Sequence, residues 1–485
     1  MDSLSIERKR ETFVCDSSRV ITRFFAPAGG SARAEKIIER VLLLSEEECR
    51  MELRRTFKEF STRHRDFEAI LFSNYKRVKK HLNDPGKHSK ERKLLIGAYF
   101  THEYSVESAA LFNPSIVAHP DQTNLTSGSM RFIITFRGIG EGHLSSIIFR
   151  TGVLDQKNNM TMDPVSPYVE QPAVEFNPSY NKHTFLLKLN ELGADTEISV
   201  RILGPLPDEF LFKQLKDSIR KVRSTVPRTV VFQETNRVID WLVRSNYEVV
   251  FRDDRPLSER VIFPVSEDER NGIEDARFVR FSNNGREARY YATYTAYDGQ
   301  SIMPMLMETR DFLKFRMCTL TGDAARNKGM ALFPRKVNGL YTMISRQDGE
   351  NLYIVQSDNI HVWNEVKELQ RPKCSWEFIQ TGNCGSPIET KKGWLLLTHG
   401  VGPLRRYCIG AELLDLQDPW KIIGKLKEPL IVPNEYEREG YVPNVAYTCG
   451  AIMHNDVLVI PYGVSDTSSC VATIKLRALL DRFAQ

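Results

Sequence analysis

Apolar side chains recur at helical spacing along the first hundred residues of the chain. Leu53, Phe57 and Phe60 are followed at similar intervals by further aromatic and aliphatic residues. Side chains three or four positions apart share one face of a helix, so this spacing is typical of amphipathic helices. Residues 32–100 are therefore predicted to be helical.

Polar residues set the predicted limits of these helices. Ser45 precedes three glutamates and indicates a helix start. Asn83-Asp84-Pro85-Gly86 is predicted to end that helical stretch, and Ser89 is predicted to begin another helix that runs to about Tyr99. Residues 1–30 are interpreted as a loose arm with one short strand at most.

The period changes from helical to alternating near Ala109. Hairpin-like groups of alternating runs follow, separated by turn residues, and they recur at roughly 40–60 residues, which favours propeller blades of degenerate sequence over a barrel or a sandwich. The predicted strands are Ser115–Ala118, Met130–Phe136, Ser145–Phe149, Tyr290–Tyr297, Leu340–Ser345, Leu352–Gln356, Gly393–His399, Tyr407–Leu414, Val445–Met453, Val457–Tyr462 and Cys470–Lys475.

Residues 155–262 interrupt this rhythm and are predicted to be an α+β insertion between the first two blades. Thr184–Leu189 and Glu197–Leu203 resemble the two strands of a hairpin. Asp208–Val222 and Gln233–Val243 have helical spacing.

Composition narrows the function classes. The 485 residues are 41% hydrophobic and 27% charged, as in ordinary globular proteins, and a net charge of +5 does not argue for nucleic acid. The N-terminal residues lack the apolar run of a secretory signal, and no stretch has the length of a membrane helix. Eight scattered cysteines form no CxxC motif, so we expect no metal site and a reducing, cytoplasmic location.

One stretch concentrates charge at the entrance of a strand. Glu274, Asp275 and Arg277 lie within Gly272–Phe281, and the next run, Arg289–Gly299, alternates and closes on an Asp-Gly turn. Such a cluster is either a salt-bridged turn or an acid held beside a cation in a functional site.

Other polar residues also mark strand ends. In a closed radial array of sheets, strand ends converge, so residues far apart in sequence can meet. Each residue also has a structural alternative: a turn former, a strand cap, a buried core histidine or an Asx turn. The candidates are Asn113, Arg137, Lys328, Arg346, His399 and Asp466.

The order and spacing of these motifs resemble glycoside hydrolase family 130, which contains β-mannoside phosphorylases and β-1,2-mannosidases. The resemblance covers about residues 109–475 without the insertion. Its motifs are Asn-Pro-Ser at 113–115, Gly-Ile-Glu-Asp-Ala-Arg at 272–277, Leu-Phe-Pro at 332–334, Gly-Trp-Leu-Leu-Leu-Thr-His-Gly at 393–400 and Tyr-Gly-Val-Ser-Asp at 462–466.

The resemblance implies a mainly β fold, a five-bladed β-propeller with a central site for inverting chemistry on β-mannosides. It implies that Asp275 is the catalytic acid, which protonates the glycosidic oxygen through a sugar hydroxyl in the phosphorylases. The family usually has proline where Ala276 stands. The remaining roles that it implies are mannosyl binding by Asn113, Arg137 and Asp466 and phosphate binding by Lys328, Arg346 and His399, with Arg326 or Asn327 as substitutes for Lys328.

These residue types favour phosphorolysis over hydrolysis. An inverting hydrolase needs a carboxylate to activate water, whereas phosphate brings its own negative charge and needs donors such as arginine. No extra glutamate stands at the Arg346 or His399 positions. We therefore expect α-mannose 1-phosphate as product, with an inverting β-1,2-mannosidase as the alternative. A sugar-binding propeller without catalysis is disfavoured because Asp275 is present.

Two domains follow from this interpretation. Residues 1–104 are predicted to be an arm and helical extension, and residues 105–485 the catalytic propeller. The expected ligands are a β-mannooligosaccharide or mannosyl disaccharide and inorganic phosphate as co-substrate, without a cofactor, nucleic acid or membrane. The helices are expected either to cap the site or to build a homo-oligomer.

Overall fold

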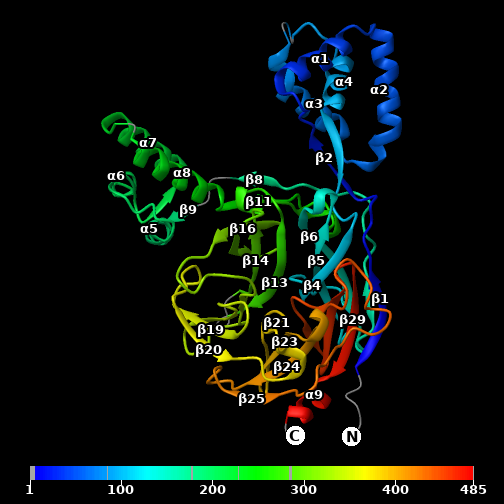
Figure 1. Cartoon of the computed structure of the whole chain (residues 1–485). Helices are drawn as coiled ribbons and strands as arrows, with labels where there is room; N and C mark the ends of the chain where they lie inside the picture. Colours follow the sequence, from blue (N-terminus) through cyan, green and yellow to red (C-terminus); the bar gives the residue numbers. More distant parts are fainter. Residues whose placement is uncertain are drawn as a thin grey trace.

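The computed structural model describes residues 6–82, 84, 86–175, 179–227, 229–282 and 287–483. The fold is mainly β, as predicted, and most of the chain beyond residue 105 forms five antiparallel sheets of four or more strands (Figure 1). The side chains of these strands alternate between two faces, and neighbouring sheets cover both faces. Many strands are therefore buried along their whole length.

The first sheet consists of β4 (Ala110–Ala118), β5 (Met130–Ile139), β6 (Ser145–Leu154), β7 (Met160–Met162) and β12 (Val261–Ile262). The second sheet consists of β13 (Ile273–Phe281), β14 (Arg289–Tyr297), β15 (Ile302–Thr309), β16 (Lys314–Thr319), β11 (Tyr247–Val250) and β8 (Ala173–Glu175). The third sheet consists of β17 (Ala331–Leu332), β18 (Tyr341–Ser345), β19 (Leu352–Ser357) and β20 (Glu365–Gln370).

The fourth sheet consists of β21 (Gln380–Asn383), β22 (Ile388–Thr390), β23 (Gly393–Val401), β24 (Tyr407–Leu414) and β25 (Ile422–Lys425). The fifth sheet consists of β26 (Ala446–Tyr447), β27 (Ile452–His454), β28 (Val457–Val464), β29 (Ser468–Lys475) and β1 (Glu7–Phe13), and α9 (Leu476–Phe483) follows it.

Consecutive sheets contact one another in a closed circuit. Strand β4 contacts β13 of the second sheet and both β28 and β29 of the fifth; the other contacts join β14 to β17, β18 and β19 to β21, and β24 to β26. Five apolar clusters lie one at each junction between sheets. At the first junction, for example, the rings of Phe149 and Phe278 have centroids 6.3 Å apart. Burial between sheets therefore holds the circuit together.

The N-terminal residues contain two strands, so the prediction of a loose arm with at most one strand is wrong. Strand β1 pairs with β29 and completes the fifth sheet, while β2 (Val20–Phe24) pairs with β3 (Thr101–Ser105). The sequence of β1, Glu-Arg-Lys-Arg-Glu-Thr-Phe, is mostly charged because this strand lies at the edge of its sheet, where one face and one edge meet solvent.

A helical unit projects from the sheets on the β2–β3 pair (Figure 1). Its helices are α1 (Gly30–Leu42), α2 (Glu46–Phe60), α3 (Phe67–Val78) and α4 (Lys90–Tyr99). The helical prediction is confirmed, including both starts: Ser45 forms a capping box with Glu48, and the Ser89 hydroxyl accepts from the Arg92 amide. Asn83 and Pro85 of the predicted helix stop lie outside the described residues.

The insertion is mainly helical, and its predicted hairpin is wrong. The segments predicted as strands belong to α5 (Lys182–Glu191) and α6 (Glu197–Leu203), whose starts are capped by Asn181 and Thr196. Over six residues, alternation and helical spacing are hard to separate, because Phe185 and Leu189 fit one helix face equally well. The two predicted helices are confirmed as α7 (Phe212–Thr225) and α8 (Val230–Arg244), beside the short pair β9 (Ser179–Asn181) and β10 (Glu209–Leu211).

The predicted strand Val445–Met453 is divided. It contains β26 and β27, and the residues between them leave the ladder so that Thr448 and Cys449 can donate to the Pro114 carbonyl at 3.2 and 2.8 Å. The other predicted strands are confirmed, most of them slightly longer than predicted. The short 3₁₀ turns are η1 (Ser61–Arg63), η2 (Lys79–His81), η3 (Glu141–His143), η4 (Leu257–Glu259), η5 (Glu267–Glu269), η6 (Ser375–Glu377) and η7 (Pro403–Arg405). Among the described residues, no helix is long and apolar enough to cross a membrane.

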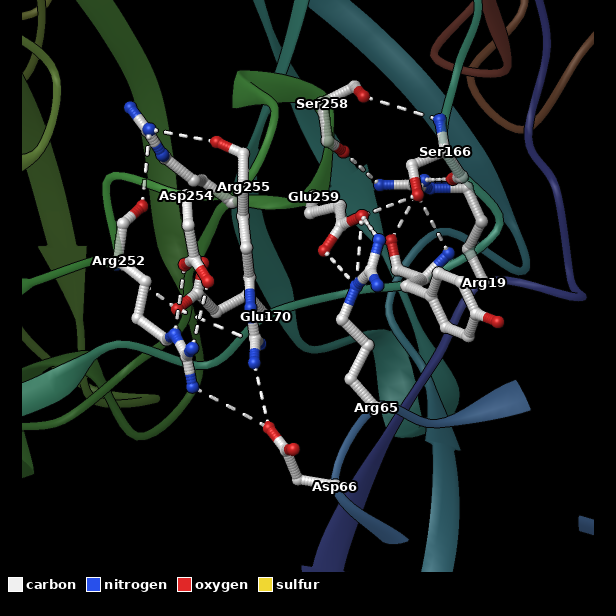
Figure 2. Close-up of polar contacts among 12 residues, drawn as sticks. Arg19, Arg65, Asp66, Ser166, Glu170, Arg252, Asp254, Arg255, Ser258 and Glu259 are labelled. Atoms are coloured by element: carbon white, nitrogen blue, oxygen red, sulfur yellow. Dashed lines mark hydrogen bonds and ion pairs between the residues drawn. The ribbon is translucent and has the colours of Figure 1, made fainter. Parts of the chain in front are cut away.

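Charged side chains fix the base of the helical unit to the first and last segments of the insertion (Figure 2). Arg65 donates twice to the fully buried Glu259 carboxylate, at 2.7 and 2.9 Å, and Ser166 donates to the same group at 2.7 Å. Burial raises the pKa of Glu259, but the hydrogen bonds from Arg65 and Ser166 outweigh it and leave that pKa below its usual value. The adjacent Asp66 pairs with Arg255 at 2.8 Å.

We predict that Arg65→Met loosens the helical unit, because it leaves the Glu259 carboxylate buried without its cation. Because the Arg65 side chain is itself 42% exposed, the loss should be smaller than the roughly 3 kcal/mol that removal of one partner costs a fully buried pair. Hydrogen–deuterium exchange should therefore show weaker protection of α3, while β23 in the fourth sheet keeps its protection. The matched control is Arg55→Met, which removes an exposed pair with Glu59 and should change protection little. If α3 is protected to the same extent in Arg65→Met and in Arg55→Met, the prediction is contradicted.

Candidate active site

Asp275 lies near the start of β13, at an interruption of the ladder with β14. The pairing shifts register between Glu274 and Arg277, and Asp275 has a φ of 54°, in the left-handed region. Aspartate and asparagine tolerate this backbone better than most residues. The bulge removes Asp275 from the alternation of the strand and turns its carboxyl toward the neighbouring sheet.

Asn113 repeats this arrangement on β4. The pairing of β4 with β5 shifts register between Phe112 and Ser115, and Asn113 has a φ of 49°. Its side-chain Nδ2 donates to Oδ1 of Asp275 at 2.7 Å. Two bulges in adjacent sheets thus bring together two residues 162 positions apart.

Glu274 links two cations that were predicted to bind different parts of the substrate. Its carboxylate accepts from Arg137 Nη2 at 2.9 Å and from Lys328 Nζ at 2.6 Å. Arg137 Nη1 also lies 3.8 Å from Asp275 Oδ1. Glu274 therefore fixes Arg137 and Lys328 beside Asp275, which explains why the strand entrance carries two acids in succession.

The surrounding cations keep Asp275 ionised. Burial raises the pKa of the Asp275 carboxyl, because it disfavours the charged form. Arg137 and Arg277 lower this pKa, and the hydrogen bond from Asn113 and the charge of Lys328 lower it further. The net pKa lies below the usual value for aspartate, so the carboxyl is an anion at neutral pH when no ligand is bound.

Arg277 is buried directly behind Asp275. Its Nη1 donates to the Asp275 carbonyl at 3.0 Å, and its Nη2 donates to the Tyr447 hydroxyl at 2.5 Å. Burial lowers the pKa of Arg277, but Tyr447, Cys449 and Asp275 raise it more, so the guanidinium stays charged. Arg277 thus fixes the bulge through its backbone, and Tyr447 from the fifth sheet holds Arg277.

His399 and Arg346 face each other on the fourth and third sheets. His399 Nε2 lies 3.5 Å from Arg346 Nη1, and its Nδ1 lies 3.1 Å from the Asn383 carbonyl, which can only accept. The imidazole therefore carries its proton on Nδ1. Burial, together with the charges of Arg346 and Arg277, lowers the pKa of His399 to about 3. Gly382 is required here, since a Cβ would lie 2.3 Å from the imidazole ring.

Asp466 occupies the turn between β28 and β29, also with positive φ, at 52°. Burial and the charge of Asp275 raise the pKa of Asp466 to about 6, although Arg137 and Arg405 act in the opposite direction. Two nearby carboxyls thus differ in protonation: Asp275 is ionised at neutral pH, and Asp466 gains a proton under mildly acidic conditions.

The structure brings all seven predicted site residues into one electrostatic network. Asp275 acts on the pKa of both Asp466 and His399, and Arg346 acts on His399. The sequence interpretation did not single out Tyr447, and it included Asn383 in a strand-end motif without giving it a role, because nothing in sequence connects these residues to residues of other sheets. Tyr447 follows Pro443-Asn444, and Asn383 precedes Cys384-Gly385, and these turn signals beside strands were the only available clues.

Known proteins similar to this chain act on mannosides. The model of glycoside hydrolase family 130, described as beta-1,4-mannooligosaccharide phosphorylase, matches residues 254–485. The chain is 33% identical to 1,2-beta-oligomannan phosphorylase of Thermoanaerobacter sp. (strain X514), over 46% of this chain and 74% of that protein. It is 36% identical to Beta-1,2-mannobiose phosphorylase of the same organism, over 42% of this chain and 67% of that protein.

A solved structure is similar over a larger part of the chain. Beta-1,2-mannobiose phosphorylase from Listeria innocua, solved with β-1,2-mannobiose, matches with a TM-score of 0.46 and 22% identity, and the match covers 79% of this chain and 93% of that chain.

We predict that His399 makes the stability of the fold depend on pH. Its pKa is about 3 in the folded state and near 6.5 when unfolded, so only the unfolded state gains a proton between these values. Stability is fully present above about pH 6.5 and declines as the pH falls, by about 2 kcal/mol at pH 5. In urea denaturation, His399→Gln should lose less stability than the wild type between pH 7 and 5.

The matched control for this measurement is His183→Gln, because His183 is exposed on α5. The opposite contribution from Asp466 is common to all three proteins and cancels in the comparison. Parallel pH dependence of the wild type and His399→Gln would show that the folded protein protonates His399 over the same pH range as the unfolded chain, and would contradict the prediction.

Proposed function

Because the chain belongs to glycoside hydrolase family 130, we propose that it catalyses inverting phosphorolysis of β-mannosides. The products are α-mannose 1-phosphate and an acceptor shortened by one mannosyl unit. The observation that carries the proposal is that Asp275 lies within the cation cluster, while Arg346 and His399, rather than a carboxylate, occupy the positions assigned to the nucleophile. The relatives named as phosphorylases of β-1,2 and β-1,4 mannosides support the substrate class.

The closed circuit of sheets supports a five-bladed β-propeller, with one sheet per blade. In this arrangement Asn113, Asp275 and Asp466 come from the first, second and fifth blades, and Arg346 and His399 from the third and fourth. Each blade contributes to one central site. The helical unit lies outside the blades (Figure 1), and the insertion extends the first two.

The mannosyl unit is assigned to the side of Asp275 where Asn113, Arg137 and Asp466 lie. An amide, a guanidinium and a carboxyl together offer donors and acceptors to ring hydroxyls. Arg137 and Asn113 already contact the carboxylates of Glu274 and Asp275, so a sugar hydroxyl bound here would share their hydrogen bonds. This supports protonation of the glycosidic oxygen through a hydroxyl of the substrate.

Phosphate is assigned to Arg346, His399 and Lys328. Arg346 offers a planar fork for two phosphate oxygens. His399 is neutral and its Nδ1 proton is directed at Asn383, so it contributes an acceptor that orients Arg346 or receives a phosphate hydroxyl. Lys328 pairs with Glu274 and would bind phosphate while keeping that contact.

The protons balance without a second protein carboxylate. Hydrogen phosphate attacks the anomeric carbon, the bond to the glycosidic oxygen breaks, and that oxygen takes a proton that comes from Asp275. The proton lost by hydrogen phosphate on forming the new C–O bond restores Asp275. Asp275 must be protonated before this step, and a phosphate dianion bound near Arg346 and Lys328 offsets the cations that keep its pKa low in the free protein.

We predict strict dependence on phosphate. With β-1,2-mannobiose or β-1,4-mannobiose, the purified chain should form α-mannose 1-phosphate, followed by phosphorus NMR, and should release little free mannose without phosphate. Asp275→Asn preserves the left-handed backbone and the volume but carries no acidic proton, so turnover should fall about 10³-fold or more while disaccharide binding remains. Equal release of free mannose with and without phosphate would instead identify a hydrolase.

We also predict that Arg346→Lys raises KM for phosphate about tenfold or more and changes KM for the disaccharide less than twofold. Lysine keeps the charge but loses the paired hydrogen bonds of the guanidinium. The matched control is Arg371→Lys, since Arg371 is exposed directly after β20 and pairs with Glu368 at 2.8 Å. If both substrates show the same change in KM, Arg346 does not act on phosphate alone.

A further inference from the structure

Several loops lie at the end of the sheets where Asp275 is found. Strand β5 continues past Arg137 into η3, and β23 continues past His399 into η7. The turn that holds Asp466 follows β28, and residues 434–445 lead into β26 in the same sheet. These loops border the assigned mannosyl position, but the roles assigned above do not use their side chains.

The segment before β26 is attached to the turn that holds Asp466. The Tyr441 amide donates to Thr467 Oγ1 at 3.0 Å, and the Val442 amide donates to the Ser465 carbonyl at 3.1 Å. Gly440 permits this approach, because a Cβ there would lie 2.4 Å from the Ser465 carbonyl. Tyr441 is therefore held at a fixed position next to Asp466.

The ring of Tyr441 is supported on one side and open otherwise. It stacks on His143 of η3, with centroids 5.5 Å apart and planes inclined by 27°. Tyr441 is nevertheless 71% exposed. The apolar surface of an exposed aromatic ring is unfavourable in water, and a ring at the surface adds no packing to the core. Binding of a ligand is therefore a physical reason for the exposed position of Tyr441.

The loop after β23 adds a cation to this border. Leu404 and Arg405 of η7 both have positive φ, at 57° and 55°, and both side chains are exposed. Consecutive non-glycine residues in this region are strained, and such strain is concentrated at functional sites. The Tyr407 amide donates to the Asn444 carbonyl at 2.9 Å, so the loop that carries Arg405 lies against the segment of Tyr441, and the charge of Arg405 lowers the pKa of Asp466.

We propose that Tyr441, supported by His143, is the stacking platform for the sugar unit on the acceptor side of the scissile bond, and that Arg405 donates to its hydroxyls. The apolar C–H face of a pyranose complements an aromatic ring, and a guanidinium complements hydroxyl oxygens. The inference rests on the proposed function for the location of the mannosyl unit beside Asp275. It makes Tyr441 a specificity residue, which favours substrates with a second sugar over mannose alone.

Binding can be measured without turnover in the Asp275→Asn background. Calorimetric titration with mannose, and with both the β-1,2-linked and the β-1,4-linked forms of mannobiose and mannotriose, gives the affinity gained from each added sugar. Tyr441→Ala should reduce affinity for the disaccharides and trisaccharides about tenfold and for mannose less than twofold. Tyr441→Phe keeps the ring and should retain the affinity, whereas His143→Ala should give an intermediate loss because it removes the support.

The matched control is Tyr436→Ala, since Tyr436 lies on the same segment and is 93% exposed. This variant should bind mannose, the disaccharides and the trisaccharides as tightly as the parent does. All variants should keep the thermal midpoint of the parent because the altered side chains are exposed. An unchanged gain from the second sugar in Tyr441→Ala overturns the inference. If the wild type makes no mannose 1-phosphate but Tyr441→Ala still loses the gain, the proposed reaction fails and the platform stands.

Discussion

The ion cluster around the largely buried Asp275 carboxylate is the constraint on which the site depends. Its carboxylate is ionised among Arg137, Arg277 and Lys328, and the arginines are themselves held by Glu274 and Tyr447. A buried charge is tolerated only when its partners are fixed. The two bulges at Asn113 and Asp275 and the turn at Asp466 direct these three side chains from separate sheets to one place, each through a left-handed backbone that asparagine and aspartate accept.

The sequence was sufficient for the strands with long alternating runs, but it missed others such as β15, β16, β20 and β25, and it did not give the pairing partners of any strand. Runs such as Gly393–His399 and Tyr407–Leu414 alternate over enough residues to specify strands, and turn residues separate them. Strand β1 was missed because its charged sequence has no apolar run and its partner β29 lies at the other end of the chain. The helices α5 and α6 were predicted as strands because six or seven residues are too few to separate the two periods.

The candidate site was predictable in its residue types but not in its pairing. The order of Asn113, Asp275, His399 and Asp466 along the chain carried the resemblance, and the structure joins them. The pairing of Lys328 with Glu274, the neutral state of His399 and the role of Tyr447 depend on distances between sheets, which no local pattern in the sequence encodes. Those distances decide which groups are charged, and hence which of them can bind an anion or move a proton.

The pairing of β1 with β29 has a consequence for how the circuit of sheets is formed. Thr12 and Cys470 on these two strands are 458 residues apart, so the fifth sheet is completed only when distant parts of the chain meet. Closure of such a long loop is entropically costly and slows folding. During synthesis β1 stays unpaired until β29 has been made. Besides suiting the edge of the sheet, its charged sequence therefore keeps the unpaired strand soluble during that interval. An apolar strand in its place would be exposed to aggregation during that interval.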